Sequence, residues 1–173
     1  MDRTRTAGTP AGYHAVTPFL AVKDIGQTMD FYRKAFGAVE RMRMELPDTK
    51  RVIHGEVTIG DSIVMLGDES PESQCLAPAS LKATTGALYV YVPDVDAAFK
   101  RATEAGCKVT MAVADMFWGD RVGEVQDPSG HRWNLATHKE DLSKEEMLRR
   151  GSAWFASQGR GSKPGSEKAH APA

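Results

Sequence analysis

The sequence predicts an α+β fold built from two copies of one βαβββ module, with an added C-terminal helix. The main observation is a repeat, because segments of one half recur in the other about 70 residues later. The matching pairs are Phe19–Ile25 with Tyr89–Val95, Gly37 with Gly106, and the Gly-Glu-Val of 55–57 with that of 123–125. A second observation is the turn Asp127–Gly130, where proline and glycine suit a tight connection between two short β-prone runs.

The first module, 16–66, shows the order strand, helix and three further strands. Asp24 has the side chain expected at a helix N-cap, and Gly37 has the conformational freedom that ends a helix. The expected elements are the strand Val16–Val22, the helix Gln27–Phe36 and strands at 39–45, 52–59 and 62–66.

The second module, 87–137, repeats this order after a linker, 67–85, that is rich in Ser, Pro, Glu and Ala. Its expected elements are the strand Ala87–Val92, the helix Val95–Ala105 and strands near 109–112, 121–125 and 132–136.

Both modules together predict one domain, 13–138, between two less regular ends. Residues 1–12 show no hydrophobic period, which predicts a flexible N-terminal lead. Ser143 and Glu146 have the spacing of a capping box and predict a C-terminal helix within 139–156. The stretch 157–173, rich in Gly, Ser, Lys, Pro and Ala, predicts a disordered tail.

Composition excludes several classes of partner. With 22 basic and 23 acidic residues the net charge is −1, so no positive field for nucleic acid is indicated. The two cysteines, Cys75 and Cys107, do not form the pattern of a disulfide framework or a metal site. No secretory signal is visible, and no run approaches the roughly 18 apolar residues of a membrane span. We therefore expect a cytoplasmic protein with neither a nucleic-acid nor a membrane partner.

The tandem βαβββ repeat, with an Asp-Pro-x-Gly turn before its last strand, resembles the vicinal oxygen chelate (VOC) superfamily. This superfamily includes glyoxalases, bleomycin-resistance proteins and extradiol dioxygenases. The run Met116–Arg121, with Gly123 and Trp133, is similar to the PhnB-like branch. The resemblance implies a cup-shaped mixed sheet, with helices on the convex faces and a ligand cavity on the concave side. It also implies a homodimer, in which a second chain covers sheet edges that would otherwise be open to uncontrolled pairing.

Metal-using members of this superfamily place His or Glu at one cup-facing position on the first and last strand of each module. The resemblance assigns those positions here to Thr17, Met65, Ala87 and Asn134. None of these is a strong ligand for a divalent metal, because methionine is soft, alanine has no donor atom, and threonine and asparagine are weak. We therefore expect no metal and no other cofactor.

A displaced metal site is the alternative. Strand alternation turns His54, Glu56 and Glu124 toward the cup, and one histidine with two carboxylates could bind a metal. The other interpretation is a set of polar side chains satisfied by hydrogen bonds or by Arg121 and Arg132. Arg121 could also pair with its neighbour Asp120 at the cavity mouth.

Three functions are compatible with these residues. The first is a small-molecule-binding protein of the resistance-protein kind. The second is an enzyme, a glyoxalase-type lyase or isomerase, with Glu56 or Glu124 as general base. The third is an interaction module whose C-terminal helix docks to a partner chain. A cup rich in aromatic side chains favours a flat or partly apolar organic molecule. The expected ligand-binding residues are Thr17, Phe19, His54, Met65, Tyr89, Tyr91, Trp118, Arg121 and Asn134.

Overall fold

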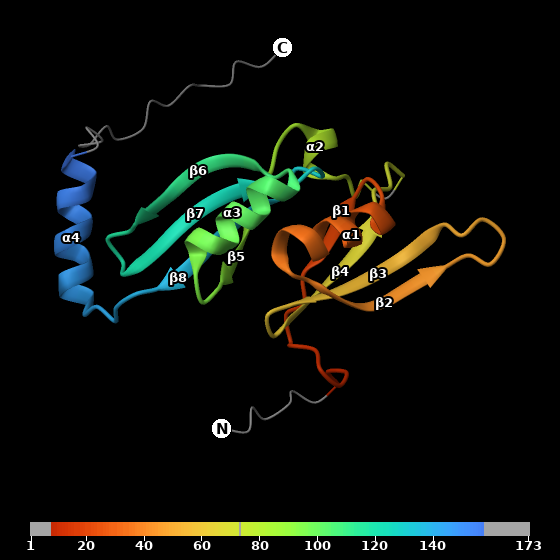
Figure 1. Cartoon of the computed structure of the whole chain (residues 1–173), viewed down its shortest axis with the longest axis horizontal. Coiled ribbons are helices and arrows are strands. Elements are labelled where there is room, and N and C mark those ends of the chain that lie inside the picture. Colours follow the sequence, from red (N-terminus) through yellow and green to blue (C-terminus); the bar gives the residue numbers. More distant parts are fainter. Residues whose placement is uncertain (1–7, 73, 158–173) are drawn as a thin grey trace, which may run out of the picture.

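The computed structural model describes residues 8–72 and 74–157 of the 173-residue chain (Figure 1). It confirms the α+β class, the tandem modules and the C-terminal helix. The first module consists of β1 (Phe19–Val22), α1 (Ile25–Phe36), β2 (Val39–Glu45), β3 (Val52–Ile59) and β4 (Ser62–Asp68). The second consists of β5 (Ala87–Tyr91), α3 (Val95–Ala105), β6 (Lys108–Asp115), β7 (Asp120–Gln126) and β8 (Arg132–His138), and is followed by α4 (Lys144–Ser157).

Both modules form a four-stranded mixed sheet with the same topology. The strand orders are β1-β4-β3-β2 and β5-β8-β7-β6. In each sheet the first and last strands of the module pair in parallel, and the other pairs are antiparallel. The registers also correspond, since Phe19 lies opposite Met65 and Tyr89 lies opposite Asn134. The repeat seen in the sequence therefore extends to strand register.

The helix boundaries follow from single residues. Asp24 and Asp94 stand before α1 and α3, and each carboxylate accepts a hydrogen bond from the backbone N–H three residues on, at 2.7 and 3.1 Å. Gly37 and Gly106 end these helices in the left-handed region, with φ of 67° and 113°. These glycines supply the conformation that a side chain would strain.

The linker and the first strand differ from the sequence-based expectation, and β4 and β6 run beyond the expected 62–66 and 109–112. The linker contains a short helix, α2 (Pro78–Leu81), which begins at a proline in the first helical position. The first strand begins at Phe19 rather than Val16, because Pro18 has no N–H to extend the ladder. Pro18 still contributes its carbonyl, which accepts a hydrogen bond from the backbone N–H of Met65.

The two modules are joined through their helices. α1 and α3 lie side by side at the centre, with one sheet on either side (Figure 1). Tyr32 of α1 donates its hydroxyl to Asp127 at 2.6 Å, and the indole of Trp133 in β8 donates to the same carboxylate at 3.0 Å. All three side chains are buried, and one hydrophobic core runs across both modules.

Each sheet has a second face, opposite its helix, which we call the outer face. The outer face of the first sheet carries Phe19, His54, Glu56 and Met65, and that of the second carries Tyr89, Tyr91, Glu124 and Asn134. Leu20 and Val22, which alternate with Phe19, are buried in the shared core. Phe19 and Tyr91 are 54% and 62% exposed. Each outer face is therefore open, and the surfaces expected to line one cup are divided between two sheets.

Within the described part of the chain, no helix is long and apolar enough to cross a membrane. Residues 1–7 of the expected flexible lead and residues 158–173 of the expected disordered tail lie outside the described residues. Ser157, expected in the tail, is the last residue of α4.

Candidate functional site on the outer faces

Glu56 is the buried anion of the first outer face. Its side chain accepts a hydrogen bond of 2.6 Å from the Tyr13 hydroxyl, and His54 Nε2 lies 3.1 Å from its other oxygen. Arg41 Nε completes the cluster at 3.3 Å. Burial raises the pKa of Glu56, but the donors Tyr13 and His54 outweigh it and hold this pKa below its usual range. Glu56 therefore stays ionised and is a weak proton acceptor near neutral pH.

Glu124 holds the equivalent position on the second outer face. It is buried in β7 and accepts a hydrogen bond of 2.6 Å from the Thr110 hydroxyl. Arg132 donates to the same oxygen through Nε at 2.8 Å and through a second guanidinium nitrogen. Glu124 is thus neutralised by Arg132 and satisfied within its own module.

A repeated β-bulge explains why both glutamates are satisfied locally. The bulges lie between Glu40 and Met42 in β2 and between Val109 and Met111 in β6. The extra residue in each case, Arg41 or Thr110, contacts the glutamate on the neighbouring strand. The bulge therefore turns one donor per module toward the buried carboxylate.

Asp120, at the start of β7, gathers four donors around one buried carboxylate. One oxygen accepts hydrogen bonds from the hydroxyls of Tyr89 and Tyr91, both at 3.0 Å, and from the indole N–H of Trp118 at 3.2 Å. The other oxygen lies 2.8 Å from His138 Nδ1. Burial raises the pKa of Asp120, but the hydrogen bonds from His138, the tyrosines and Trp118 lower it below its usual range.

Burial and this carboxylate both favour the protonated form of the two tyrosines. Burial, with the hydrogen bond to Asp120, raises the pKa of Tyr89 to about 12. The hydrogen bond to Asp120 is also the main reason that the pKa of Tyr91 is raised. Both phenols therefore donate a hydrogen bond to Asp120 throughout the physiological pH range.

His138 connects Asp120 to the surface. Its Nε2 lies 3.0 Å from Asp141, so the imidazole stands between two carboxylates. The hydrogen bonds with Asp120 and Asp141 raise its pKa. Sequence reasoning missed this cluster, although strand alternation from Glu124 would have placed Asp120 on the same face.

Arg121 does not lie at the expected place. It points from β7 to the helix side of the sheet, where Nε and Nη2 each donate to Asp96 of α3 at 2.9 Å and Nη1 donates to Asp115 at 3.2 Å. The expected ion pair with Asp120 is wrong, because successive residues of a strand point to opposite faces. Arg121 is thus separated from the outer face, and its ion pairs stabilise the surface around α3.

The residues expected to bind ligand form two rows rather than one cup. On the first sheet Phe19, Met65 and Glu56 are neighbours across three strands, and on the second Tyr89, Asn134 and Glu124 are their repeat equivalents. Tyr91 and Trp118 join the second row through Asp120, and His54 joins the first through Glu56. Thr17 lies before β1, with its hydroxyl bonded to the carbonyl of His14.

The donor set does not fit a divalent metal at the superfamily's usual positions. Met65 and Asn134 occupy equivalent places in the two rows, but a thioether and an amide are poor ligands for a divalent metal. Thr17 lies outside β1, and Ala87, which lies opposite Arg132, has no donor atom in its side chain. The displaced set is not assembled either, because Glu124 lies on the other sheet from His54 and Glu56. Among the residues that the structure describes, no three His, Cys, Asp or Glu side chains could together hold a metal ion.

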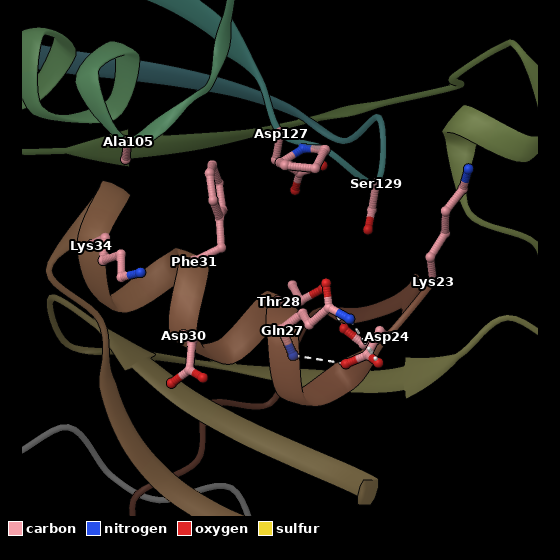
Figure 2. A pocket seen from close by; sticks show the side chains of 11 residues that line it. Lys23, Asp24, Gln27, Thr28, Asp30, Phe31, Lys34, Ala105, Asp127 and Ser129 are labelled. Carbon is pink, nitrogen blue, oxygen red and sulfur yellow. Dashed lines mark hydrogen bonds between the residues drawn. The ribbon is translucent and has the colours of Figure 1, made fainter. Parts of the chain in front are cut away.

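A pocket of about 520 Å³ lies away from both outer faces, between α1 and the Asp127–Gly130 turn (Figure 2). Two of its polar groups already serve the fold, since Asp24 caps α1 and Asp127 accepts from Tyr32 and Trp133. Phe31, the turn residue Ser129 and the lysines Lys23 and Lys34 are among the other residues that line it. This pocket lies at the joint of the modules and contains none of the residues expected to bind ligand.

Comparison with known proteins gives one consistent family. The sequence profile of the Glyoxalase/Bleomycin resistance protein/Dioxygenase superfamily matches residues 13–135. An uncharacterized protein of Mycobacterium bovis is 41% identical over 150 residues, which cover 85% of this chain and 95% of that protein. An uncharacterized protein of Mycobacterium tuberculosis is equally similar, with 85% of each chain covered.

Solved structures share the fold at lower identity. TioX from Micromonospora sp. ML1 is 25% identical with a TM-score of 0.57, covering 75% of this chain and 100% of TioX. A glyoxalase-related enzyme from Fulvimarina pelagi is 17% identical with a TM-score of 0.55, covering 72% of this chain and 88% of that one. The PhnB protein of Bacillus cereus is 20% identical with a TM-score of 0.54, covering 72% and 99%. The last two similarities show the fold alone.

Proposed function

Because the chain belongs to the glyoxalase/bleomycin resistance protein/dioxygenase superfamily, we propose that it binds a small, flat or partly apolar organic molecule. The proposed site is the outer faces of the two sheets, and binding needs no metal ion. These faces combine exposed aromatic rings with a few fixed polar groups, as small-molecule sites do.

One observation carries this proposal. The buried carboxylates of the outer faces, Glu56, Glu124 and Asp120, accept hydrogen bonds from their own module, while the rings of Phe19 and Tyr91 stay exposed. The carboxylates thus stabilise the arrangement of the side chains around them, and the exposed aromatic rings remain available to contact a ligand. Burying such aromatic area is the ordinary source of affinity for flat ligands.

An enzyme with a glutamate general base is the alternative, and it has less support. A useful base has a pKa near the working pH, whereas the pKa of Glu56 is lowered. One oxygen of Glu124 accepts from both Arg132 and Thr110, and this ion pair with Arg132 makes the carboxylate a weaker base.

We also propose that the protein is a homodimer. The edge strands β2 and β6 leave open hydrogen-bonding edges that a second chain would cover. The helix α4 adds apolar surface, because Leu148 and Phe155 are exposed and lie two turns apart on one side.

The direct test is to identify what the purified protein carries and whether it is converted. The protein is extracted with organic solvent, the extract is analysed by mass spectrometry, and any molecule found is incubated with fresh protein. We expect a planar organic compound that binds stoichiometrically and is recovered unchanged. Catalytic conversion that persists in a metal chelator would instead support the general-base enzyme.

A further inference from the structure

The second outer face carries aromatic side chains whose polar atoms are all directed at one buried charge. Tyr89, Tyr91 and Trp118 each donate to the same oxygen of Asp120, at 3.0, 3.0 and 3.2 Å. Each of these groups has a single hydrogen to donate, and that hydrogen is engaged. A ligand on this surface therefore meets ring faces and not free hydroxyl or indole donors.

The two tyrosine rings are accessible and close together. Their ring centroids are 5.2 Å apart with an angle of 52° between the planes, and the residues Tyr89 and Tyr91 are 43% and 62% exposed. They form an open aromatic pair on the surface of β5. Exposed aromatic faces next to each other are suited to contact a flat molecule.

The charge behind this pair is negative. Asp120 is buried at the hydroxyl ends of the two rings, and the titratable groups beyond it are His138 and Asp141. One imidazole between two carboxylates leaves a net negative charge whether or not the imidazole is protonated. Glu124 and Arg132 on the same face neutralise each other, and Lys108 lies opposite Gln126, at the other end of β7 from Asp120.

Hydrogen bonding to Asp120 also changes the rings themselves. A phenol that donates to a carboxylate gains electron density, and the negative face of an aromatic ring attracts cations. The repeat equivalent of Tyr89 on the first sheet is Phe19, which has no hydroxyl and no such carboxylate contact. The two outer faces therefore differ in their preference for charge.

We infer that the Tyr89–Tyr91 pair, backed by Asp120, binds a flat organic cation, such as an N-alkylated heteroaromatic ring or a protonated aromatic amine. This inference rests on the proposed function and specifies the ligand's charge and the sheet that binds it. A cation over aromatic rings is favoured over a neutral molecule of the same shape by about three- to tenfold in affinity. Anions are disfavoured by the same charge.

The test compares two probes of nearly equal shape, 1-methylquinolinium and the neutral 1-methylnaphthalene. Their dissociation constants are measured by calorimetry with the full chain and with Tyr91→Leu, Tyr91→Phe and Phe19→Leu. Tyr91 is mostly exposed, so its replacement leaves the core intact. Phe19→Leu is the comparison, because it removes an exposed ring from the other outer face, at the repeat equivalent of Tyr89 and without a carboxylate contact.

We expect the cation to bind about three- to tenfold more tightly than the neutral probe. This ratio should fall to near one in Tyr91→Leu, fall part of the way in Tyr91→Phe, and stay as it is in Phe19→Leu. Equal binding of both probes would overturn the inference and leave the proposed function standing. A preference that survives Tyr91→Leu would also overturn it, because the cation would then bind elsewhere. If neither probe binds, the proposed function itself fails.

Discussion

Replacing Asp120 by asparagine tests the cluster that shapes the second outer face. The side chains have the same size, but a neutral amide replaces a charged acceptor of four hydrogen bonds. A hydrogen bond to a charged group contributes about 1.5–3 kcal/mol and a neutral one about 1. Since the tyrosines are partly exposed and can return to water, we expect Asp120→Asn to lower the free energy of unfolding by about 1–3 kcal/mol.

The loss should depend on pH in a defined direction. The pKa of His138 is raised above its ordinary 6.5, so its stabilising contact with Asp120 is complete below that value and is lost as pH rises through the folded-state pKa. Because the pKa of Asp120 is lowered, its ionised form adds to the free energy of unfolding above pH 3.8. This stabilisation is lost only when the pH falls through the folded-state pKa of Asp120. Asp120→Asn should therefore cost more stability at about pH 5.5 than at about pH 9.

Urea unfolding at both pH values measures this difference, and an NMR titration of His138 measures its pKa directly. In Asp120→Asn the His138 pKa should move down toward its ordinary value. Asp96→Asn is the matched control, because Asp96 is an exposed carboxylate that pairs with Arg121 away from the cluster. Equal losses at both pH values, or an unchanged His138 titration, would refute the assigned role of Asp120.

Three further predictions follow from the structure. Elemental analysis should find no stoichiometric divalent metal; about one zinc, iron, nickel or manganese per chain, lost in His54→Ala, would show a displaced site. Light scattering should give a dimer mass, and the double change Leu148→Glu with Phe155→Glu should shift it toward the monomer; a monomeric parent chain would contradict the dimer proposal. Tyr32→Phe should lower the urea-unfolding free energy by about 1–3 kcal/mol, since the buried Asp127 loses a donor; no loss would contradict that role.

The fold could be predicted because the repeat and the turn chemistry are local. Asp24 and Asp94 mark helix starts by their side chains, Gly37 and Gly106 mark helix ends by their backbone freedom, and the predicted strands 39–45 and 52–59 match β2 and β3. The short helix α2 was not predicted, because a single turn has no hydrophobic period to detect. Its start at Pro78 was the available signal.

The candidate site could be predicted only in part, for a geometric reason. Alternation correctly placed Tyr89, Glu124 and Asn134 on one face, because these positions follow the period of a strand. The relative placement of the two sheets depends on how α1 and α3 pack, which no short motif specifies. The role of Asp120 was missed because its donors come from β5, β8 and the loop before β7, which meet only in the folded chain.

The indole N–H signals of the three tryptophans offer the most direct test of binding at the outer face. Trp118 donates to Asp120 at the outer face, and Trp133 is buried in the core. Trp154 lies in α4 and packs against Phe117. Titration with 1-methylquinolinium, followed by ¹H–¹⁵N NMR and assigned with Trp→Phe variants, should shift the Trp118 signal saturably and leave Trp133 unchanged. Saturable binding by calorimetry with an unmoved Trp118 signal would contradict the account.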